Sequence, residues 1–190
     1  MANKKNRLGM LVLVLVFGMT VVGCDNGTTK ENDGGENTNS NGTTGGGSDV
    51  WSDVTSFSQL NGTWKAPSTA TATGNGFKYT AQYSNYTITF NSNTKTLLFS
   101  GTIKMTFSDG NINELWPDIK EGLLEYVNQE DGVTVSSTND TNHSITMTFN
   151  NYSESLDDDY IQVMGPQINQ NGTKLIIQDG MGFKVIYTKQ

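Results

Sequence analysis

The chain has 190 residues, enough for one domain with further segments, and it carries 12 cationic and 19 acidic side chains for a formal charge of −7. The first 23 residues contain three of the cations and no acid. The remaining chain therefore holds nine cations and 19 acids, for a formal charge of −10. A field of this sign repels phosphate groups, which excludes nucleic acid as an expected partner and membrane attachment through a basic patch. The single cysteine, Cys24, excludes a disulfide within the chain.

The first residues follow the order of a secretory signal peptide. Lys4, Lys5 and Arg7 form a basic start, and an apolar run from Leu8 to Val22 follows. This run is shorter than the roughly 20 apolar residues that span a bilayer. The sequence therefore predicts a signal peptide over residues 1–23 that is cut before the cysteine.

The residues Val21-Val22-Gly23-Cys24 resemble the lipobox of bacterial lipoproteins. The resemblance implies that Cys24 carries a thioether-linked diacylglycerol and, on its new amine, a further acyl chain such as palmitate. Two or three acyl chains hold a protein stably on a membrane, whereas one holds it only marginally. We therefore expect a lipid-anchored protein of the cell envelope. Asp25 matches a retention mark for the inner membrane in some bacteria, so the membrane and the leaflet stay open.

Residues 25–49 predict a disordered linker. Gly, Asn, Thr and Ser dominate this segment, and it holds no aromatic or aliphatic side chain to bury. A flexible chain of this length has a typical end-to-end distance of roughly 25–30 Å. Its expected role is to space the domain, residues 50–190, away from the membrane.

From residue 50 onward the strand period dominates. Apolar residues alternate with Thr, Ser or Lys in three segments, 86–90, 102–107 and 144–149, which is typical of strands with one face buried. Turn residues separate further strand candidates at Gly62–Ala66, Phe77–Tyr83, Lys95–Ser100, Gly132–Ser136, Tyr160–Met164, Thr173–Gln178 and Gly182–Thr188. Gly101 within a long strand run predicts a bend or bulge. The fold class expected is all-β, a small antiparallel barrel or a sandwich.

One segment has helical spacing. Apolar residues between Asn111 and Asn128 recur three or four positions apart, and Pro117 disfavours helix at Trp116, so we expect a short turn and then a helix from Pro117. Acids lie on another face of this inserted helix at Glu114, Asp118, Glu121 and Glu125. This acidic stripe is either a surface for a cation or partner or, more commonly, a plain solvated face.

Residues suited to catalysis are few. His143 falls in an expected hairpin turn, which supplies neither a positioned partner nor exclusion of water, and Cys24 is expected to carry lipid. The acids Asp157, Asp158 and Asp159 lack the spacing of a calcium loop and read more readily as a solvated turn. We therefore expect no enzyme, no cofactor and no metal site.

The segment from Phe57 to Trp64, Phe-Ser-Gln-Leu-Asn-Gly-Thr-Trp, resembles the opening of lipocalins. The resemblance implies a barrel whose end is closed by Trp64, with a basic residue of the last strand, Lys184 or Lys189, over its ring. The helix lies in mid-chain here instead of near the C-terminus, which departs from lipocalin topology. The alternative is that Trp64 is an ordinary core aromatic residue.

These patterns predict a lipocalin-like domain that binds a small apolar or amphipathic ligand. The expected ligand-binding residues are Trp64, Phe90, Phe107, Phe149 and Tyr187. The alternative is a surface interaction module with a filled core, no small-molecule ligand and a protein partner that the sequence leaves unknown. In either case the strand alternation predicts a set of inward-facing residues. This set comprises Ile88, Phe90, Ile103, Met105, Phe107, Ile145, Met147 and Phe149, facing Trp64, Phe183, Val185 and Tyr187.

Overall fold

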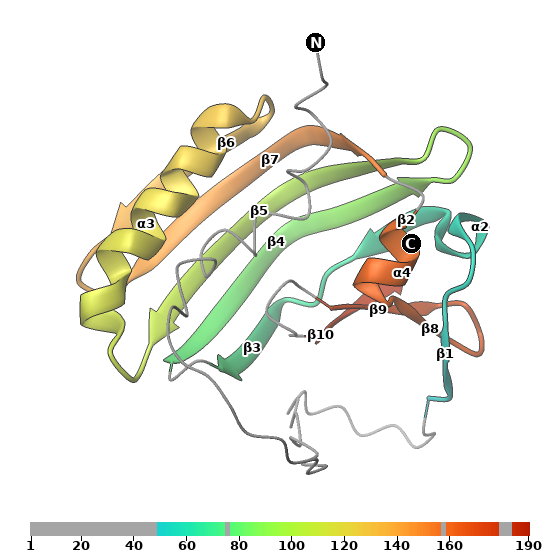
Figure 1. The fold of residues 1–190 in the computed structure, drawn as a ribbon, viewed down its shortest axis with the longest axis horizontal. Helices are drawn as coiled ribbons and strands as arrows, with labels where there is room; N and C mark the ends of the chain where they lie inside the picture. The colour runs from blue at the N-terminus through green and yellow to red at the C-terminus, as the bar shows by residue number, and fades with distance from the viewer. Residues whose placement is uncertain (1–48, 75–76, 157–158, 179–183) are drawn as a thin grey trace, which may run out of the picture.

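The computed structural model describes residues 49–74, 77–156, 159–178 and 184–190, which form one antiparallel sheet with helices against it (Figure 1). The strands are β1 (Trp51–Asp53), β2 (Gly62–Lys65), β3 (Thr69–Gly74), β4 (Phe77–Asn91), β5 (Thr96–Ser108), β6 (Val133–Asn139), β7 (Ser144–Ser155), β8 (Gln167–Asn169), β9 (Lys174–Gln178) and β10 (Lys184–Lys189). The helices are α2 (Phe57–Leu60), α3 (Ile112–Gln129) and α4 (Tyr160–Met164). The predicted antiparallel, mainly β fold is confirmed.

The sheet is open and does not close into a barrel. Its strand order is β1-β8-β9-β10-β2-β4-β5-β7-β6, so that β1 and β6 end the path among the described strands. β2 pairs with the second part of β4, and β3 pairs with its first part. In Figure 1 the strands β8 to β10 lie at a large angle to β4, β5 and β7, so the sheet turns strongly along its length.

Two strands are longer than the sequence pattern predicted, because each continues through a bulge. β4 spans 15 residues and β5 spans 13. Their pairing shifts between Ser84 and Thr87, and the pairing of β5 with β7 shifts between Phe99 and Gly101. Gly101 has φ +107°, and a Cβ there would lie 2.4 Å from the carbonyl oxygen of Asn85. The predicted irregularity at Gly101 is therefore confirmed, and only glycine fits this close approach.

The inner face of the sheet carries the predicted core. Ile145 and Met147 are at most 1 % exposed. The other buried residues of the predicted inward-facing set are at most 7 % exposed. The buried members are Trp64, Ile88, Phe90, Met105, Phe107, Ile145, Met147, Phe149, Val185 and Tyr187. Ile103 packs against this core but is only partly buried. Phe183 lies outside the described residues.

Helix α3 begins earlier than predicted, at Ile112, and contains Pro117. The carbonyl of Asn111 accepts the first helical hydrogen bonds, so the turn before the proline is already helical. Ile112 and Trp116 are 5 % and 4 % exposed, and the Trp116 indole donates to Asp140 at 2.8 Å. These contacts outweigh the local preference of the residue before a proline for extended backbone.

The segment Tyr160–Met164, predicted as a strand, is the short helix α4. Gly165 ends this helix in the left-handed conformation, and its amide donates to the carbonyl of Ile161 at 3.0 Å. Tyr160 packs against Phe57 of α2 and Phe90 of β4. A five-residue apolar run suits either structure, and here the tertiary contacts select the helix. The sequence pattern also missed the short strands β1 and β8 and the strand β3.

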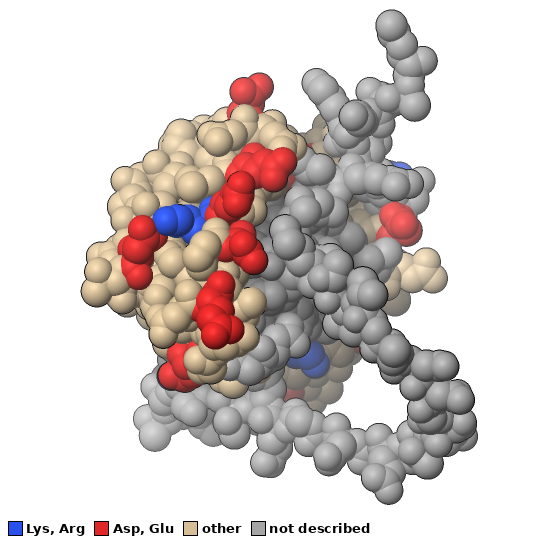
Figure 2. All heavy atoms as spheres, turned by 60° about the vertical axis from the view of Figure 1, so that its left-hand side comes forward, with Lys and Arg blue, Asp and Glu red and all other residues tan. Residues whose placement is uncertain are grey.

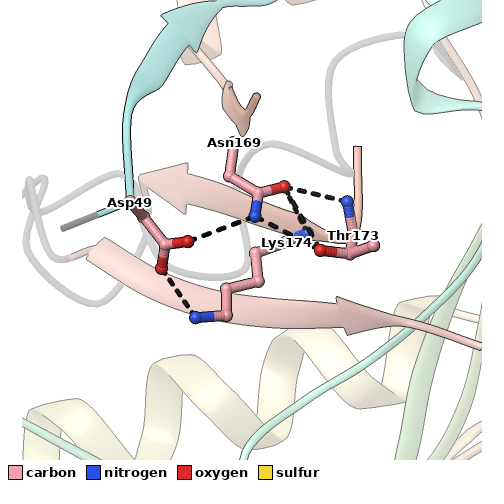
Figure 3. Close-up of polar contacts among 4 residues, drawn as sticks. All are labelled: Asp49, Asn169, Thr173 and Lys174. Carbon is pink, nitrogen blue, oxygen red and sulfur yellow. Dashed lines mark hydrogen bonds and ion pairs between the residues drawn. The ribbon is translucent and has the colours of Figure 1, made fainter. Parts of the chain in front are cut away.

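A cluster of polar side chains fixes the start of the domain (Figure 3). Asp49 pairs with Lys174 of β9 at 2.6 Å and accepts a hydrogen bond from the amide group of Asn169 at 3.3 Å. The other side of Asn169 accepts the backbone amides of Thr173 and Lys174 at 2.8 and 2.9 Å. Asn169 is 4 % exposed, so these bonds satisfy a buried side chain. Asp49, predicted as the last residue of the linker, therefore belongs with the domain.

Candidate functional site

The structure places a cation over Trp64, as the sequence predicted. Trp64 is fully buried, and its indole nitrogen donates to the carbonyl of Leu60 at 2.6 Å. The ammonium of Lys189 lies 5.1 Å from the centre of the Trp64 ring, because Lys189 and Trp64 are paired residues of β10 and β2. Of the two predicted lysines, Lys189 is therefore the one that covers the ring.

Gly62 makes this arrangement possible. It has φ +119°, and a Cβ at this position would lie 3.3 Å from Cε of Lys189. The lysine side chain thus crosses the space that a side chain at position 62 would occupy on its way to the Trp64 ring. The Gly-x-Trp pattern has a structural reason here, since both the backbone conformation and the path of the lysine require glycine.

Phe107 is a contact between the sheet and α3. Its ring centre lies 6.1 Å from that of Tyr79 and 6.0 Å from that of Trp116. Phe149, by contrast, belongs to an aromatic group farther along the sheet, 5.5 Å from Tyr86. The five predicted ligand-binding residues are thus all buried, but Phe107 lies beneath the helix.

Phe90 and Tyr187 lie toward α4. The ring of Phe90 lies 6.3 Å from that of Tyr160, edge to face. Tyr187 is 7 % exposed, and burial raises the pKa of its hydroxyl well above the ordinary value, with smaller effects from Tyr83 and Tyr86.

A carboxylate lies on the inner face of β7. Glu154 pairs with Leu97, and Tyr152 pairs with Phe99, so both residues lie on the face that carries the core. The hydroxyl of Tyr152 donates to Glu154 Oε1 at 2.6 Å, a short hydrogen bond of the kind made to charged acceptors. Glu154 is partly exposed, whereas Tyr152 is 6 % exposed. The carboxylate thus lies between the aromatic core and the solvent.

A third polar group, the hydroxyl of Tyr126, faces this pair from α3. Tyr126 is 2 % exposed, so its hydroxyl is withdrawn from water. Burial raises the pKa of this hydroxyl above the ordinary value, and the hydroxyl of Tyr152, which lies beside it, lowers it. Tyr126 is therefore linked to Glu154 through Tyr152.

Electrostatics around Glu154 are unfavourable to its charge. Burial raises the pKa of Glu154, the hydrogen bond from Tyr152 lowers it, and the nearby carboxylate of Glu130 raises it again. Within the described part of the chain, neither Lys nor Arg forms an ion pair with Glu154. The carboxylate therefore has a phenol donor and an acidic neighbour, an environment that is common at binding and catalytic sites.

Two more tyrosines complete the surroundings of this carboxylate. Burial raises the pKa of Tyr86 on β4 and of Tyr160 on α4, and Glu154 contributes to both shifts. Phenol groups from three elements besides β7 thus lie within electrostatic range of one carboxylate. We call this group, Glu154 with Tyr86, Tyr126, Tyr152 and Tyr160, the Glu154 cluster.

The sequence pattern missed the Glu154 cluster because β7 does not keep its alternation. The predicted strand ended at Phe149, and the observed strand continues to Ser155. Asn151, at φ +55°, shifts the period, so that Tyr152 and Glu154 lie inward although simple alternation from Phe149 would place them outward. The sequence did offer a signal for the longer strand, because Asn150 and Asn151 are followed by Tyr152 and Glu154 at a spacing of two.

The acidic stripe of α3 is exposed and lies on the opposite side of the helix from its buried residues (Figure 2). Glu114, Asp118, Glu121 and Glu125 all face the solvent. Lys120 on the same helix pairs with Asp140 at 2.7 Å. No described residue bridges the acids into a closed site, which matches a solvated face.

His143 has a packing role in the turn between β6 and β7. Its ring meets that of Trp116 edge to face at 5.8 Å, and its carbonyl accepts the amide of Phe107 at 3.0 Å. The region that the structure describes contains no group of three or more His, Cys, Asp or Glu residues arranged to hold a metal ion. Cys24, Asp157 and Asp158 lie outside the described residues.

No helix in the described part of the chain is long and apolar enough to cross a membrane. Comparisons with known proteins find no matching family model, no similar curated protein and no similar solved structure.

Proposed function

We propose that the protein is lipid-anchored in the cell envelope through Cys24 and that its domain binds a small amphipathic ligand on the inner face of the sheet. The observation that carries the second part is the Glu154 cluster. It places a partly exposed carboxylate, hydrogen-bonded by the hydroxyl of Tyr152, at the edge of an aromatic core. An amphipathic molecule suits such a place, because its apolar part contacts rings while its polar part bonds the hydroxyl and the carboxylate.

The anchor part rests on the sequence of the first 24 residues. The only cysteine falls at the end of an apolar run that is too short to span a bilayer. A proposed linker then leads to the domain, whose first described residue, Asp49, pairs with Lys174. Such a protein captures ligand close to a membrane without embedding its domain in the lipid.

Native mass spectrometry tests the ligand proposal. The mature protein, extracted from bacterial membranes in detergent, is expected to retain or take up a small amphipathic molecule. Tyr126→Phe removes one oxygen atom from the Glu154 cluster and is expected to lower this occupancy, while Thr106→Ser on the outer face of β5 leaves it unchanged. A protein that carries no small molecule and takes none up would contradict the proposal.

The second candidate is an interaction module with a filled core. The packing of Phe107 between Tyr79 and Trp116 favours it, because this part of the inner face is covered by α3. The two candidates differ at the Glu154 cluster: a filled core needs no ligand there, and Tyr126→Phe would then change stability alone.

A further inference from the structure

We propose that the outer face of the sheet, the face opposite the core, binds the acidic stripe of α3 from a second copy of this chain. The two surfaces carry opposite charges. Because α3 packs on the inner side of its own sheet, its stripe and the outer face of the same molecule lie on different sides and can meet only between molecules. The proposal goes beyond ligand binding and does not involve the Glu154 cluster.

The strands β2 to β7 place lysines, and no acid, on the outer face. Lys65, Lys78 and Lys104 each lie next to buried residues of β2, β4 and β5, so the alternation of each strand turns them away from the core. The only acid of these six strands, Glu154, lies on the inner face. None of the three lysines forms an ion pair with a described residue. The outer face is therefore a cationic surface on a chain of negative net charge.

No described element covers this outer face. Hydroxyl groups fill the space between the lysines and bond to one another across the strands, as Thr63 does with Thr89 at 2.9 Å. The described helices contact the sheet from the inner side, through Leu60 of α2, Trp116 of α3 and Tyr160 of α4. The lysines and hydroxyls are thus open to a partner with acceptor groups.

The acidic stripe is the surface of this chain with the complementary charge (Figure 2). Its carboxylates extend from Glu114 to Glu125 over about 16 Å, because a helix rises about 1.5 Å per residue. Lys78 and Lys104 lie about 13 Å apart along the strands, since Lys104 pairs with the residue four positions after Lys78. One stripe is therefore long enough to contact two lysines of another copy at once.

A hollow in the exposed surface of α3 adds a fit of shape. It has a volume of about 520 Å³, and Pro117 and Leu124 line it together with Glu121 and Glu125. A lysine side chain joins an aliphatic stem to a charged end, so its stem suits the apolar residues and its ammonium suits the carboxylates. The hollow thus gives the stripe a place for a lysine of the outer face.

The negative net charge of the chain does not prevent this contact. At physiological ionic strength the field of an exposed charge decays over about 8 Å, so the lysines of one copy interact with the nearby stripe more than with distant acids. Each exposed ion pair contributes little, so we expect a weak contact, which copies confined to one membrane would form more often. Since the two surfaces differ, the association is head to tail.

Carbodiimide cross-linking, which joins a lysine amine directly to a carboxylate, tests the contact. The mature full-chain protein in detergent is prepared with natural and with heavy nitrogen, and the two forms are mixed in equal amounts. Mass spectrometry should find cross-linked peptides of mixed isotope that join Lys65, Lys78 or Lys104 to the acidic stripe. Their yield should fall several-fold in 1 M sodium chloride, where charges are screened within about 3 Å.

Two charge-reversed variants supply the controls. One combines Lys65→Glu, Lys78→Glu and Lys104→Glu, and the other replaces the four acids of the stripe by lysine. Neither variant alone should form these cross-links. Mixed together, they should restore cross-links between the same positions with the chemistry reversed. Mixed with the parent protein, the first variant should react only through its own stripe, which also shows that its α3 is intact.

Three outcomes would overturn the proposal. The first is the absence of mixed-isotope cross-links between the outer face and the stripe in the parent protein. The second is cross-links of the outer-face lysines to acids outside α3 alone, which would assign the face to a different acidic surface. The third is failure of the two variants to restore the cross-links together, although thermal melts show that both are folded. None of these outcomes bears on the proposed ligand binding.

Discussion

At the scale of single residues, glycines and tyrosines carry the most specific information. Gly62 and Gly101 both have positive φ, and a side chain at either would meet a neighbour within 3.3 Å. In the Glu154 cluster, in contrast, burial disfavours the charge of the carboxylate, and the hydrogen bond from Tyr152 offsets part of that cost. The glycines stabilise the fold, whereas the position of Glu154 on the inner face is a feature that core packing alone does not explain.

Gly62→Ala tests the explanation of the Gly-x-Trp pattern. Alanine at φ +119° is strained, and its Cβ would push on Lys189, so the variant should lose about 1–3 kcal/mol in free energy of unfolding. The matched control is Gly122→Ala in α3, where a Cβ would meet no atom within 4 Å. The control should be neutral or more stable by about 0.5–1 kcal/mol. Equal losses in denaturant melts of the two variants would refute the special role of Gly62.

Tyr126→Phe and Tyr152→Phe should differ in their effect on stability. Tyr152→Phe removes the donor to Glu154 and should cost about 1.5–3 kcal/mol in free energy of unfolding. Tyr126→Phe removes a hydroxyl that lies beside the Tyr152 hydroxyl and makes no bond to the carboxylate, so its cost should stay below about 1 kcal/mol. Urea denaturation at neutral pH measures both, and equal losses in the two variants would contradict the special role of the bond from Tyr152 to Glu154.

The raised pKa of Glu154 predicts how stability varies with pH. Because its pKa is higher in the folded than in the unfolded chain, the folded state holds more protons between the two values. This contribution to stability is therefore present at acid pH and is lost as the pH rises from the ordinary glutamate range through the raised value. Glu154→Gln should be relatively more stable above that window than below it. Melts across pH 4–8 that show a constant difference from the parent protein would exclude this linkage.

At the scale of elements, the prediction from sequence succeeded where the period was regular. The alternation in 86–90, 102–107 and 144–149 gave the correct strands and, apart from the partly buried Ile103, the correct inner face. It did so because one buried face imposes a period of two on an antiparallel strand. A lysine over Trp64 was expected from the resemblance of residues 57–64 to lipocalins, which left Lys184 and Lys189 as alternatives, and the pairing of β10 with β2 selects Lys189.

Elements that depend on tertiary contacts could not be predicted in this way. The first turn of α3 forms in spite of Pro117 because Ile112 and Trp116 are buried beneath it. α4 is helical because Tyr160 packs between Phe57 and Phe90. The Glu154 cluster escaped prediction since a single residue, Asn151, reverses the faces of β7.

The contact between α3 and the sheet predicts the effect of truncating Phe107. This ring is 3 % exposed and packs against Tyr79 and Trp116, so Phe107→Ala should cost about 3–5 kcal/mol. Thr106, its neighbour on the other face of β5, is only partly buried, and Thr106→Ala should cost much less. Denaturant melts compare the two. Equal losses would mean that the face assignment of β5 is wrong.

At the scale of the whole molecule, the proposal divides the chain into an anchor, a linker and a domain that are separable parts. The described fold begins at Asp49, where an ion pair and the buried Asn169 hold the chain against β8 and β9 (Figure 3). Everything that the proposed ligand site needs lies after that point, on β4, β7, α3 and α4. Loss of the anchor should therefore change the location of the protein and leave its fold and its ligand binding intact.

Cys24→Ala tests this separation. The thiol is the only one in the chain, so the variant cannot receive a thioether-linked lipid. Without acyl chains, each buried methylene of which contributes about 0.8 kcal/mol, an acidic domain has little affinity for a membrane. Detergent phase separation should move the protein from the detergent phase to the aqueous phase, and labelling with a radioactive fatty acid should disappear. The midpoint of thermal unfolding should match that of the parent protein, because the replaced residue precedes the described domain. Membrane association that survives the replacement would refute lipid anchoring through Cys24, and a lowered midpoint would show that the domain depends on the segment before Asp49.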